Sequence, residues 1–482
     1  MKKVCWPYFD PEFDTLPERI NGPTVLLYFP RSCRVTIDNE NTEDCTVVKV
    51  DSVNKQGLLL EVVQVLTDMN LQICKSYISS DAGWFMDVFH VIDEHGNKLT
   101  DQKVINYIQQ AIGRSRGSPH SIKAYSSKVF PNYLHPNEHT AIEMTGADHP
   151  GLFSEISAAL ADLHCNIDEA HAWTHNARLA CVAYITDQST HSPIEDPCRL
   201  AYIEDRLTTV LRATTNPNSP RGNQQEVKMV ELHGREGTMT TVERRLHQLM
   251  LSVRDFEAPS GPTTAEMPSG GEEMRRKRMV RIESCKQKGY SIVSIECKDR
   301  PRLMFDAVCT LTDMQYVIFH ASISAHRGYA FQEYFIRHID GYALSTESEK
   351  ERVAKCLEAA IERRVCEGVR VELRAENRVG MLSDITRMLR ENGLAVVRAD
   401  VETHGEKSVN AFYVRDVSGN YEVDIDYFVQ SVKREMGPTV LHINHNIRTA
   451  DDANTTPISF GHKLRSHIDR LSHALLILSA HD

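Results

Sequence analysis

Hydrophobic residues recur along the chain in four stretches that share one spacing. In each stretch a loop is followed by apolar residues at its second, fifth and ninth positions, namely Leu59/Val62/Leu66, Phe153/Ile156/Leu160, Met304/Ala307/Leu311 and Leu382/Ile385/Leu389. Such spacing lines up one apolar stripe along a helix. The pattern therefore predicts four amphipathic helices at equivalent places of a repeated unit.

Each predicted helix is followed by two strand-like runs, such as 71–80 and 84–92 in the first unit. A second helix is predicted at 101–112, 200–211, 347–364 and 424–436, and a short closing strand at 121–125, 227–232 and 440–443. Between the third and fourth units, the run 365–372 is expected to form one strand that closes the third unit and begins the fourth. The order β-α-β-β-α-β predicts an α+β fold of tandem ferredoxin-like units, each with helices on one face of an antiparallel sheet.

The loop before each helix carries a repeated motif, Asn/Asp-x-x-Gly-apolar-apolar. It occupies 54–59, 148–153 and 377–382, whereas the third copy, 299–304, has Arg302 in place of the glycine. A β-branched residue stands sixteen positions after the glycine position in every copy, at Ile73, Ile167, Ile318 and Val396. This constancy indicates a duplicated supersecondary unit.

The repeats divide the chain into an ordered series of segments. We predict an N-terminal segment 1–44, unit one 45–126, unit two 138–235, an amphipathic helix within 236–257, a flexible linker with a basic cluster 258–289, unit three 290–366, unit four 367–445, and a tail 446–482. The linker is assigned because 258–271 is rich in Pro, Gly and Ser and poor in apolar residues. The tail contains Leu464, Ile468, Leu471, Leu475 and Leu478 at helical spacing, which predicts a further amphipathic helix.

Composition narrows the class of protein and its compartment. The 482 residues carry a formal net charge of −11, with 41% hydrophobic and 25% charged residues, which opposes a general affinity for nucleic acid or anionic membrane. Twelve cysteines without a Cys-x-x-Cys pair, and a start without a secretory pattern, favour a reducing compartment. We expect the cytoplasm, with the basic run 275–278 as a candidate nuclear import signal.

The units resemble ACT domains, which are small regulatory modules that bind amino acids, and the tandem of four is similar to the plant ACT domain repeat (ACR) family. The matching runs are 54–68, 84–89, 172–176, 244–248, 309–316 and 333–341, and the resemblance spans about residues 1–445. The chain is also similar to the C-terminal part of bacterial uridylyltransferases that sense glutamine, although their nucleotidyltransferase part has no counterpart here. The resemblance implies an amino acid, by analogy glutamine, bound between paired domains.

A glycine at a helix N-terminus lets a ligand carboxylate approach free backbone N–H groups, and a nearby Asn or Asp side chain can hold an ammonium or cap the helix. The candidate ligand-binding residues at the turns are Asn54, Gly57, Leu58, Asp148, Gly151, Leu152, Asn377, Gly380 and Met381. The resemblance to ACT domains further implies a ligand near the start of the second strand, at Ile73, Ile167 and Val396. The competing interpretation is that the glycines serve backbone geometry and the Asn and Asp residues serve capping alone. In copy three, Arg302 either pairs with an acidic group or marks a structural copy, and we favour the second.

Several other chemistries find little support in the sequence. His171 with His175, and His135 with His139, have helical metal-ligand spacing but fall on predicted strand or loop, so no metal or cofactor is expected. The run 327–334 follows an RNA-recognition octapeptide, yet the expected aromatic partner on the first strand, 291–297, is missing. Phosphate-loop, acyl-transfer and metalloprotease motifs do not occur, so catalytic residues are not assigned.

We therefore predict a non-catalytic amino-acid sensor whose partners are a free amino acid and either a second copy of the chain or another protein, without nucleic acid or membrane. Two alternatives stay open. One is an interaction scaffold that binds no small ligand. The other is a diverged uridylyltransferase-like enzyme, which would need metal-binding carboxylates outside the repeats.

Overall fold

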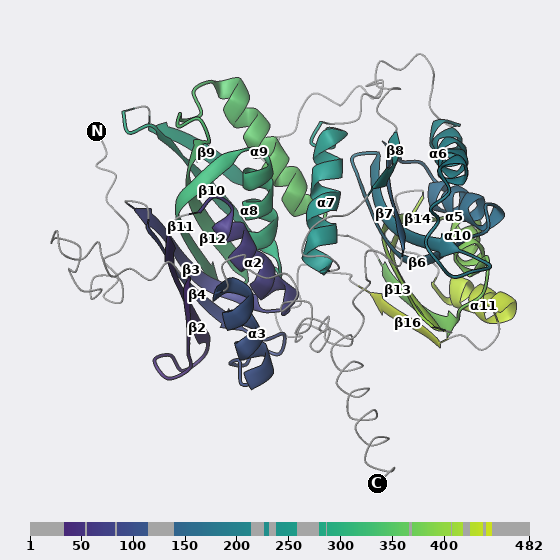
Figure 1. Cartoon of the computed structure of the whole chain (residues 1–482), viewed down its shortest axis with the longest axis horizontal. Helices are drawn as coiled ribbons and strands as arrows, with labels where there is room; N and C mark the ends of the chain where they lie inside the picture. The colour runs from purple at the N-terminus through teal and green to yellow at the C-terminus, as the bar shows by residue number, and fades with distance from the viewer. Residues whose placement is uncertain are drawn as a thin grey trace, which may run out of the picture.

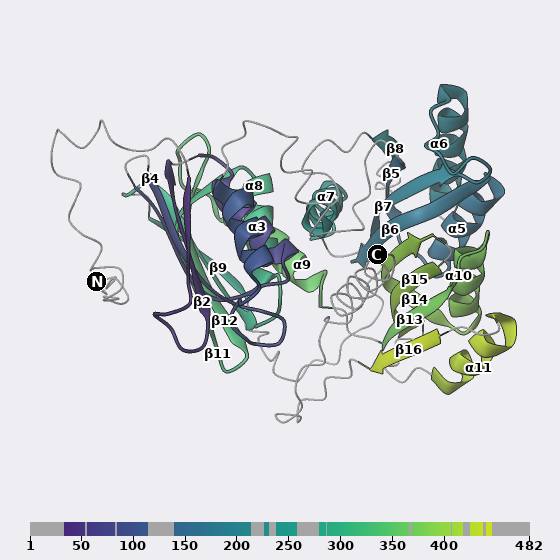
Figure 2. The same ribbon diagram turned by 60° about the horizontal axis from the view of Figure 1, so that its bottom comes forward.

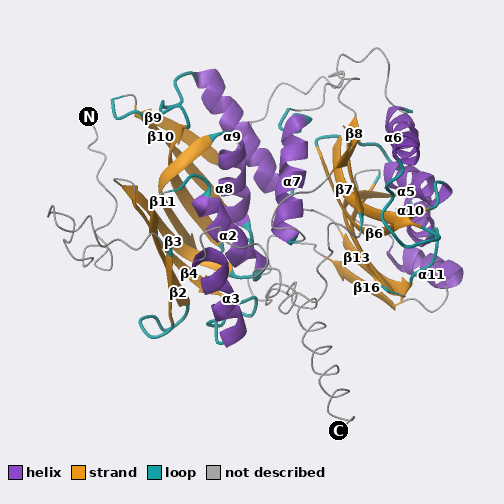
Figure 3. Cartoon of the chain, viewed as in Figure 1, coloured by secondary structure: helices purple, strands orange, loops and turns teal. Residues whose placement is uncertain are grey.

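The computed structural model describes residues 33–53, 55–81, 84–113, 139–213, 226–230, 238–257, 279–285, 287–365, 369–405, 407–417, 425–436 and 440–445. These residues form two eight-stranded antiparallel sheets with helices packed on them (Figures 1 and 3). The basic run 275–278, the linker 258–271, the predicted strand 121–125, His135 and the C-terminal amphipathic pattern lie outside the described residues.

The first sheet joins copies one and three of the repeat, which we call the first pair. Copy one contributes β1 (Arg34–Asp38), β2 (Thr46–Val53), α2 (Leu58–Asp68), β3 (Gln72–Asp81), β4 (Trp84–Ile92) and α3 (Gln102–Gly113). Copy three contributes β9 (Val280–Cys285), β10 (Tyr290–Lys298), α8 (Leu303–Asp313), β11 (Tyr316–His326), β12 (Tyr329–His338) and α9 (Glu347–Glu362). The strand order is β1-β2-β4-β3-β11-β12-β10-β9, so the two copies meet where β3 pairs with β11.

The second sheet joins copies two and four, the second pair. Copy two contributes β5 (Thr140–Ala147), α5 (Leu152–Asp162), β6 (Cys165–His175), β7 (Arg178–Asp187), α6 (Pro197–Arg212) and β8 (Glu226–Val230). Copy four contributes β13 (Val369–Glu376), α10 (Met381–Glu391), β14 (Leu394–His404), β15 (Lys407–Asp416), α11 (Ile425–Met436) and β16 (Val440–His445). The order β16-β13-β15-β14-β6-β7-β5-β8 again joins the copies through their second long strands, β14 and β6.

The two pairs differ in where each outer strand comes from, and this corrects three predictions. In the second pair β8 and β16 follow their units, as the sequence predicts, whereas in the first pair β1 and β9 precede theirs. The predicted boundaries 45–126 and 290–366 therefore omit β1 and β9, and β9 lies within the segment assigned as linker. The run 365–372 does not serve two units, because β13 begins at Val369 and pairs with strands of copy four.

Every copy builds its first helix in the same way. The residue before the helix has a positive φ of 82° at Gly57, 91° at Gly151, 67° at Arg302 and 75° at Gly380, a left-handed conformation that glycine adopts without strain. The apolar stripe that the sequence predicts is buried: Leu66, Leu160, Leu311 and Leu389 are each at most 1% exposed. The β-branched residue sixteen positions later stands beside a β-bulge in all four copies.

Helix α7 (Met239–Ser252) lies between the two pairs (Figures 1 and 2). One side packs Val242, Leu246, Leu249 and Met250 against the face of the second sheet that its own helices leave open, in a cluster with Trp173. The other side contacts α2 and α8, which cover the first sheet. The molecule is therefore layered as sheet, helices, α7, sheet, helices, as Figure 2 shows from a second direction.

Candidate functional site

Each of the four turns lies at the junction of two paired copies. The strands that join the copies, β3 with β11 and β6 with β14, pair antiparallel. The end of such a strand in one copy therefore lies beside the beginning of its partner strand in the other copy, and the turn before the first helix lies at the same place. The arrangement brings Ile73 to the turn of copy three, since Ile73 and Arg302 line one pocket. Binding of an amino acid at such a junction would require residues from both copies.

The candidate residues occupy equivalent places. Leu58, Leu152 and Met381 begin their helices and are 7%, 0% and 3% exposed, so they belong to the two cores. Ile73, Ile167 and Val396 are half-buried against the same cores. Asn377 is exposed, and Asn54 lies outside the described residues.

Helix capping by the motif carboxylate or amide is not what the structure shows at the described turns. Helices α5 and α10 begin after Gly151 and Gly380 without a side-chain capping hydrogen bond. Asp148 instead lies against Thr174, and its burial raises the pKa of the carboxyl to about 6. The contact of Asp148 with Thr174 does not support the alternative in which this aspartate serves helix capping alone.

A small pocket lies at the turn of copy three, which we call the copy-three pocket. Its walls are Thr67 and 71–73 of copy one, the turn 299–305 of copy three, 323–325 at the end of β11, and Ala330 and Gln332 of β12. Its free volume is about 20 Å³, which is enough for one water molecule. The site corresponds in position to the predicted binding turns, but it belongs to the copy that the sequence led us to treat as structural.

The copy-three pocket offers groups of both charges. Gln72 Nε2 donates to Asp299 Oδ2 over 3.3 Å, across the boundary between the copies. Burial raises the pKa of Asp299, although Arg300 and the Gln72 amide oppose the shift. Arg300 and Arg302 lie on the same wall. Arg300 also pairs with Asp306 and Arg302 with Glu243, so a ligand carboxylate would share these guanidinium groups with the two buried acids.

The equivalent places in the second pair carry a threonine hydrogen bond between the two copies. Thr174 Oγ1 donates to the Val397 carbonyl at 3.3 Å, and Thr403 Oγ1 donates to the Ile167 carbonyl at 3.2 Å. Both threonines stand seven positions after the β-branched residue, where copy three has the exposed Ala325. Alanine has no hydroxyl group, so copy three lacks this bridge, and Ala325 lines the copy-three pocket.

The turn of copy two is covered as well. The side chain of Arg390, from α10 of copy four, lies so close to Gly151 that a Cβ atom on this glycine would come within 2.7 Å of Arg390 Cδ. At Gly57 and Gly380 a Cβ atom would meet nothing within 4 Å. The glycine of copy two therefore accommodates a neighbouring side chain in addition to a left-handed backbone.

Arg302 forms an ion pair with Glu243 of α7. This corrects our preference for a purely structural copy three, because the alternative, a partner of opposite charge, is what the structure contains. Burial opposes the charge of Glu243, but Arg302 and Arg364 lower its pKa to about 2. A non-glycine residue in the left-handed region costs about 1–2 kcal/mol, and Arg302 adopts this conformation while it is paired with Glu243.

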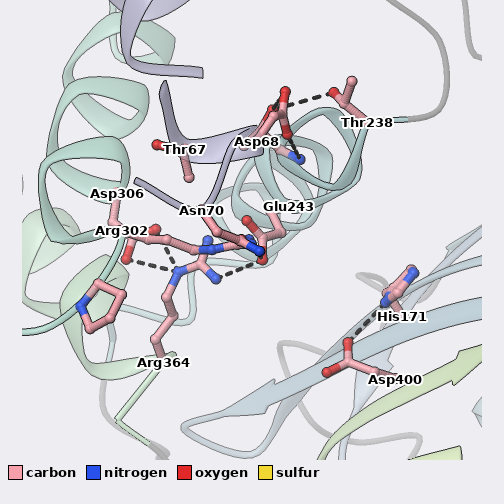
Figure 4. Close-up of polar contacts among 12 residues, drawn as sticks. Thr67, Asp68, Asn70, His171, Thr238, Glu243, Arg302, Asp306, Arg364 and Asp400 are labelled. Atoms are coloured by element: carbon pink, nitrogen blue, oxygen red, sulfur yellow. Dashed lines mark hydrogen bonds and ion pairs between the residues drawn. The ribbon is translucent and has the colours of Figure 1, made fainter. Parts of the chain in front are cut away.

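Around Glu243 lies a buried network that joins α7 to copy three, which we call the α7 junction. Asp306 accepts from His247 Nε2 at 2.9 Å, from Arg364 Nε at 2.7 Å, and pairs with Arg300 at 2.8 Å. Figure 4 shows Arg364 reaching both Asp306 and Glu243. Burial works against the charge of Asp306, but Arg364 and Arg300 hold its pKa far below the usual value.

His247 is neutral in this network. Its Nδ1 accepts from Arg363 at 2.8 Å while its Nε2 donates to Asp306, and burial lowers its pKa. Arg364 lies between two aromatic rings, 5.1 Å from the centroid of Trp173 and 5.9 Å from that of Phe305. Copy two, copy three and α7 therefore share one desolvated cluster of charges and rings.

Two of the histidines considered as metal ligands, His171 and His175, have acidic partners. His171 bonds Asp400 at 2.8 Å and Glu169 at 2.7 Å, and although burial disfavours its charge, these bonds raise its pKa to about 10. His175 bonds Asp255 at 2.9 Å. Within the described ranges, no three His, Cys, Asp or Glu side chains gather as metal ligands. Nor do these ranges contain a helix with the length and apolar character needed to cross a membrane.

Sequence reasoning missed Gln72, Asp299, Ala325 and Glu243. A signal for Ala325 was present: aligning the four units at the β-branched residue shows threonine in copies two and four but alanine in copy three. Glu243 had no comparable signal, because it lies outside the repeats and its partner depends on where α7 docks.

Comparison with known proteins agrees with the repeat structure. A model of the ACR family N-terminal ACT domain matches residues 41–118, and a general ACT domain model matches 369–424. The Arabidopsis thaliana ACT domain-containing protein ACR2 is 60% identical over 98% of this chain and 99% of its own length. ACR3 from the same plant is 50% identical over 92% of this chain and 91% of its own.

A more distant match is a bifunctional uridylyltransferase/uridylyl-removing enzyme from Nitrobacter hamburgensis, 35% identical over 21% of this chain and 11% of that enzyme. The expected resemblance to uridylyltransferases is thus confined to a small region. The full-length similarity and the two domain models confirm the predicted family and the ferredoxin-like α+β fold. The chain belongs to the ACR family of ACT domain-containing regulatory proteins.

Proposed function

We propose that this protein is a non-catalytic regulator that binds a free amino acid in the copy-three pocket. The observation that carries the proposal is the pairing of Asp299 with Gln72 beside Arg300 and Arg302, where two copies meet. Asp299 would hold the ligand ammonium, and the guanidinium groups would hold its carboxylate. The ligand side chain would then face Gln332 and the apolar wall at Ile73 and Met304.

A thermal unfolding screen with each of the twenty amino acids at millimolar concentration tests this proposal. A ligand present at a hundred times its dissociation constant stabilises the folded state by about 2.7 kcal/mol. We expect one or a few amino acids to raise the melting temperature selectively. Glutamine is the first candidate, by resemblance to glutamine-sensing enzymes.

Two matched variants locate the site. Asp299→Asn removes the charge that would hold the ammonium, and Asp148→Asn makes the same change in copy two, where Thr174 bonds the partner copy and Arg390 lies against Gly151. The shift should disappear in Asp299→Asn and persist in Asp148→Asn. If no amino acid stabilises the wild-type protein, the scaffold function replaces this proposal.

A further inference from the structure

Both walls of the copy-three pocket are attached to one turn of α7. On the copy-one side, Asp68 lies between the lining residues Thr67 and Leu71, and it accepts from Thr240 N at 3.1 Å and Thr240 Oγ1 at 2.9 Å. On the copy-three side, Arg302 pairs with Glu243. Thr240 and Glu243 are three residues apart on a helix, so they lie on one face. Figure 4 shows Asp68 and Arg302 approaching this part of α7.

The pocket is too small for its proposed ligand while these contacts persist. A free volume of about 20 Å³ holds one water molecule, whereas pockets for small ligands measure roughly 300–1,000 Å³. An amino acid can enter only if 67–73 and 299–305 separate or if Arg302 moves. Either change strains the contacts to Thr240 and Glu243, because each wall is held by one of them.

Breaking the ion pair between Arg302 and Glu243 costs free energy, because Glu243 is buried. Glu243 is 2% exposed, and its Oε2 has no hydrogen-bond partner among the described residues, so its charge depends on the two guanidinium groups at Oε1. A ligand carboxylate that draws Arg302 away leaves Arg364 as the remaining partner. A buried carboxylate with fewer partners destabilises the surrounding contacts.

We infer that α7 is a clamp across the copy-three pocket, and that binding of an amino acid there releases Thr240 and Glu243 and loosens α7 from the first pair. The inference rests on the proposed function. Because Leu246, Leu249 and Met250 pack on copy two, and Arg245 pairs with Glu143 of that copy, α7 stays with the second pair. Ligand occupancy is thereby converted into weaker attachment between the two pairs.

The loosening is confined to the first half of the helix. His247 bonds Asp306 at 2.9 Å, and Gln248 bonds Asp313 at 3.2 Å, and neither of these aspartates lines the pocket. Binding equilibria are reciprocal, so whatever weakens the clamp must strengthen ligand binding by the same factor. The two directions of this linkage can be measured independently.

Hydrogen exchange of the full chain, with and without a mixture of the twenty amino acids, tests the clamp. We expect slower exchange in 299–305 and faster exchange in 239–246, with 247–252 unchanged. The variants Glu243→Gln and Thr240→Val should lower the half-saturating concentration of the mixture by about fivefold or more. Arg245→Gln is the control: it weakens α7 on the copy-two side, and the half-saturating concentration should stay within about twofold of wild type.

The outcomes separate the clamp from the proposed function. Protection of 299–305 without faster exchange in 239–246, together with unchanged half-saturation in the variants, overturns the clamp and leaves amino-acid binding intact. Absence of protection and of thermal stabilisation in the wild type and in both variants overturns amino-acid binding itself. Thr240→Val, which replaces a hydroxyl by a methyl group, decides the matter if Glu243→Gln does not fold.

Discussion

The two domain pairs of this protein share one pattern of strand pairing and differ in what lies beside their turns. In the second pair, Thr174 and Thr403 each bridge to the partner copy, and Arg390 covers Gly151. In the first pair, Ala325 lines the copy-three pocket without such a bridge, and Arg302 pairs with Glu243 of α7. The duplicated framework thus places the turns in equivalent positions, while a few side chains decide what lies beside each turn.

The largest expected effect concerns an aspartate that occurs at the same helix position in copies three and four. Asp306 is fully buried among Arg300, Arg364 and His247, whereas Asp384 is a third exposed and pairs with Arg378 and Arg387. Asp306→Asn should lower the free energy of unfolding by about 3–5 kcal/mol, because it leaves buried guanidinium groups uncompensated. Asp384→Asn should cost less than about 1 kcal/mol. Equal losses in urea unfolding would show that the α7 junction is not the stabilising core of the first pair.

The next effect concerns pH and the clamp residue Asp68. Burial raises its pKa to about 6 in the folded protein, above the ordinary value of 3.8, so the folded state holds this proton more tightly. The stabilising contribution is complete below about pH 4 and is lost as pH rises through 6, with a slope of at most about 1.4 kcal/mol per pH unit. Between pH 4 and 7, Asp68→Asn should therefore lose less stability than the wild type. Parallel curves of unfolding free energy against pH would refute this assignment.

A smaller difference in stability is expected between substitutions of the turn glycines Gly57 and Gly151. Gly57→Ala and Gly151→Ala each place a side chain in the left-handed region, at a cost of about 1–2 kcal/mol. Gly151→Ala must in addition displace Arg390, so it should be the more damaging change. In a double-mutant cycle measured by chemical denaturation, Arg390→Ala should remove the extra loss and leave the Gly57→Ala value unaffected. Equal losses at both glycines would contradict the close approach of Arg390.

The smallest effect is expected at the threonine bridges. Thr403→Ala and Thr174→Ala each remove one hydrogen bond between copies two and four and should cost about 0.5–1.5 kcal/mol in unfolding free energy. Both changes recreate the arrangement at Ala325 and should make the second pair more open to exchange near 165–168 and 394–397. Unchanged exchange there would mean that the threonines do not close these junctions.

Local sequence patterns were sufficient to predict the helices, the strands and the protein family. The apolar stripes ending at Leu66, Leu160, Leu311 and Leu389 predicted the first helices, and the glycine motif located three of the four left-handed turns. The order of the elements also predicted the ferredoxin-like units. These features depend on neighbours within a few residues, where periodicity is informative.

Contacts between distant segments were not predictable in this way. The pairing of β3 with β11 joins residues more than two hundred positions apart, and β9 fills an outer position that the repeat order assigns to a later strand. Arg302 replaces the glycine of the motif, and from the sequence we interpreted copy three as structural. Its partner Glu243 could not be predicted, because it lies on a helix outside the repeats. The candidate site could be located at the turns, but the copy that holds the pocket follows from tertiary packing.

The most direct test of amino-acid binding in the copy-three pocket is a calorimetric titration of Ala325→Thr against the wild type, using the amino acid that gives the largest thermal stabilisation. Ala325 is exposed on a strand, where threonine is favoured, so the variant should fold, and its hydroxyl can form the bridge seen at Thr174 and Thr403. The account predicts binding heat in the wild type and none in Ala325→Thr. Equal affinity in both proteins would contradict it and place the ligand elsewhere.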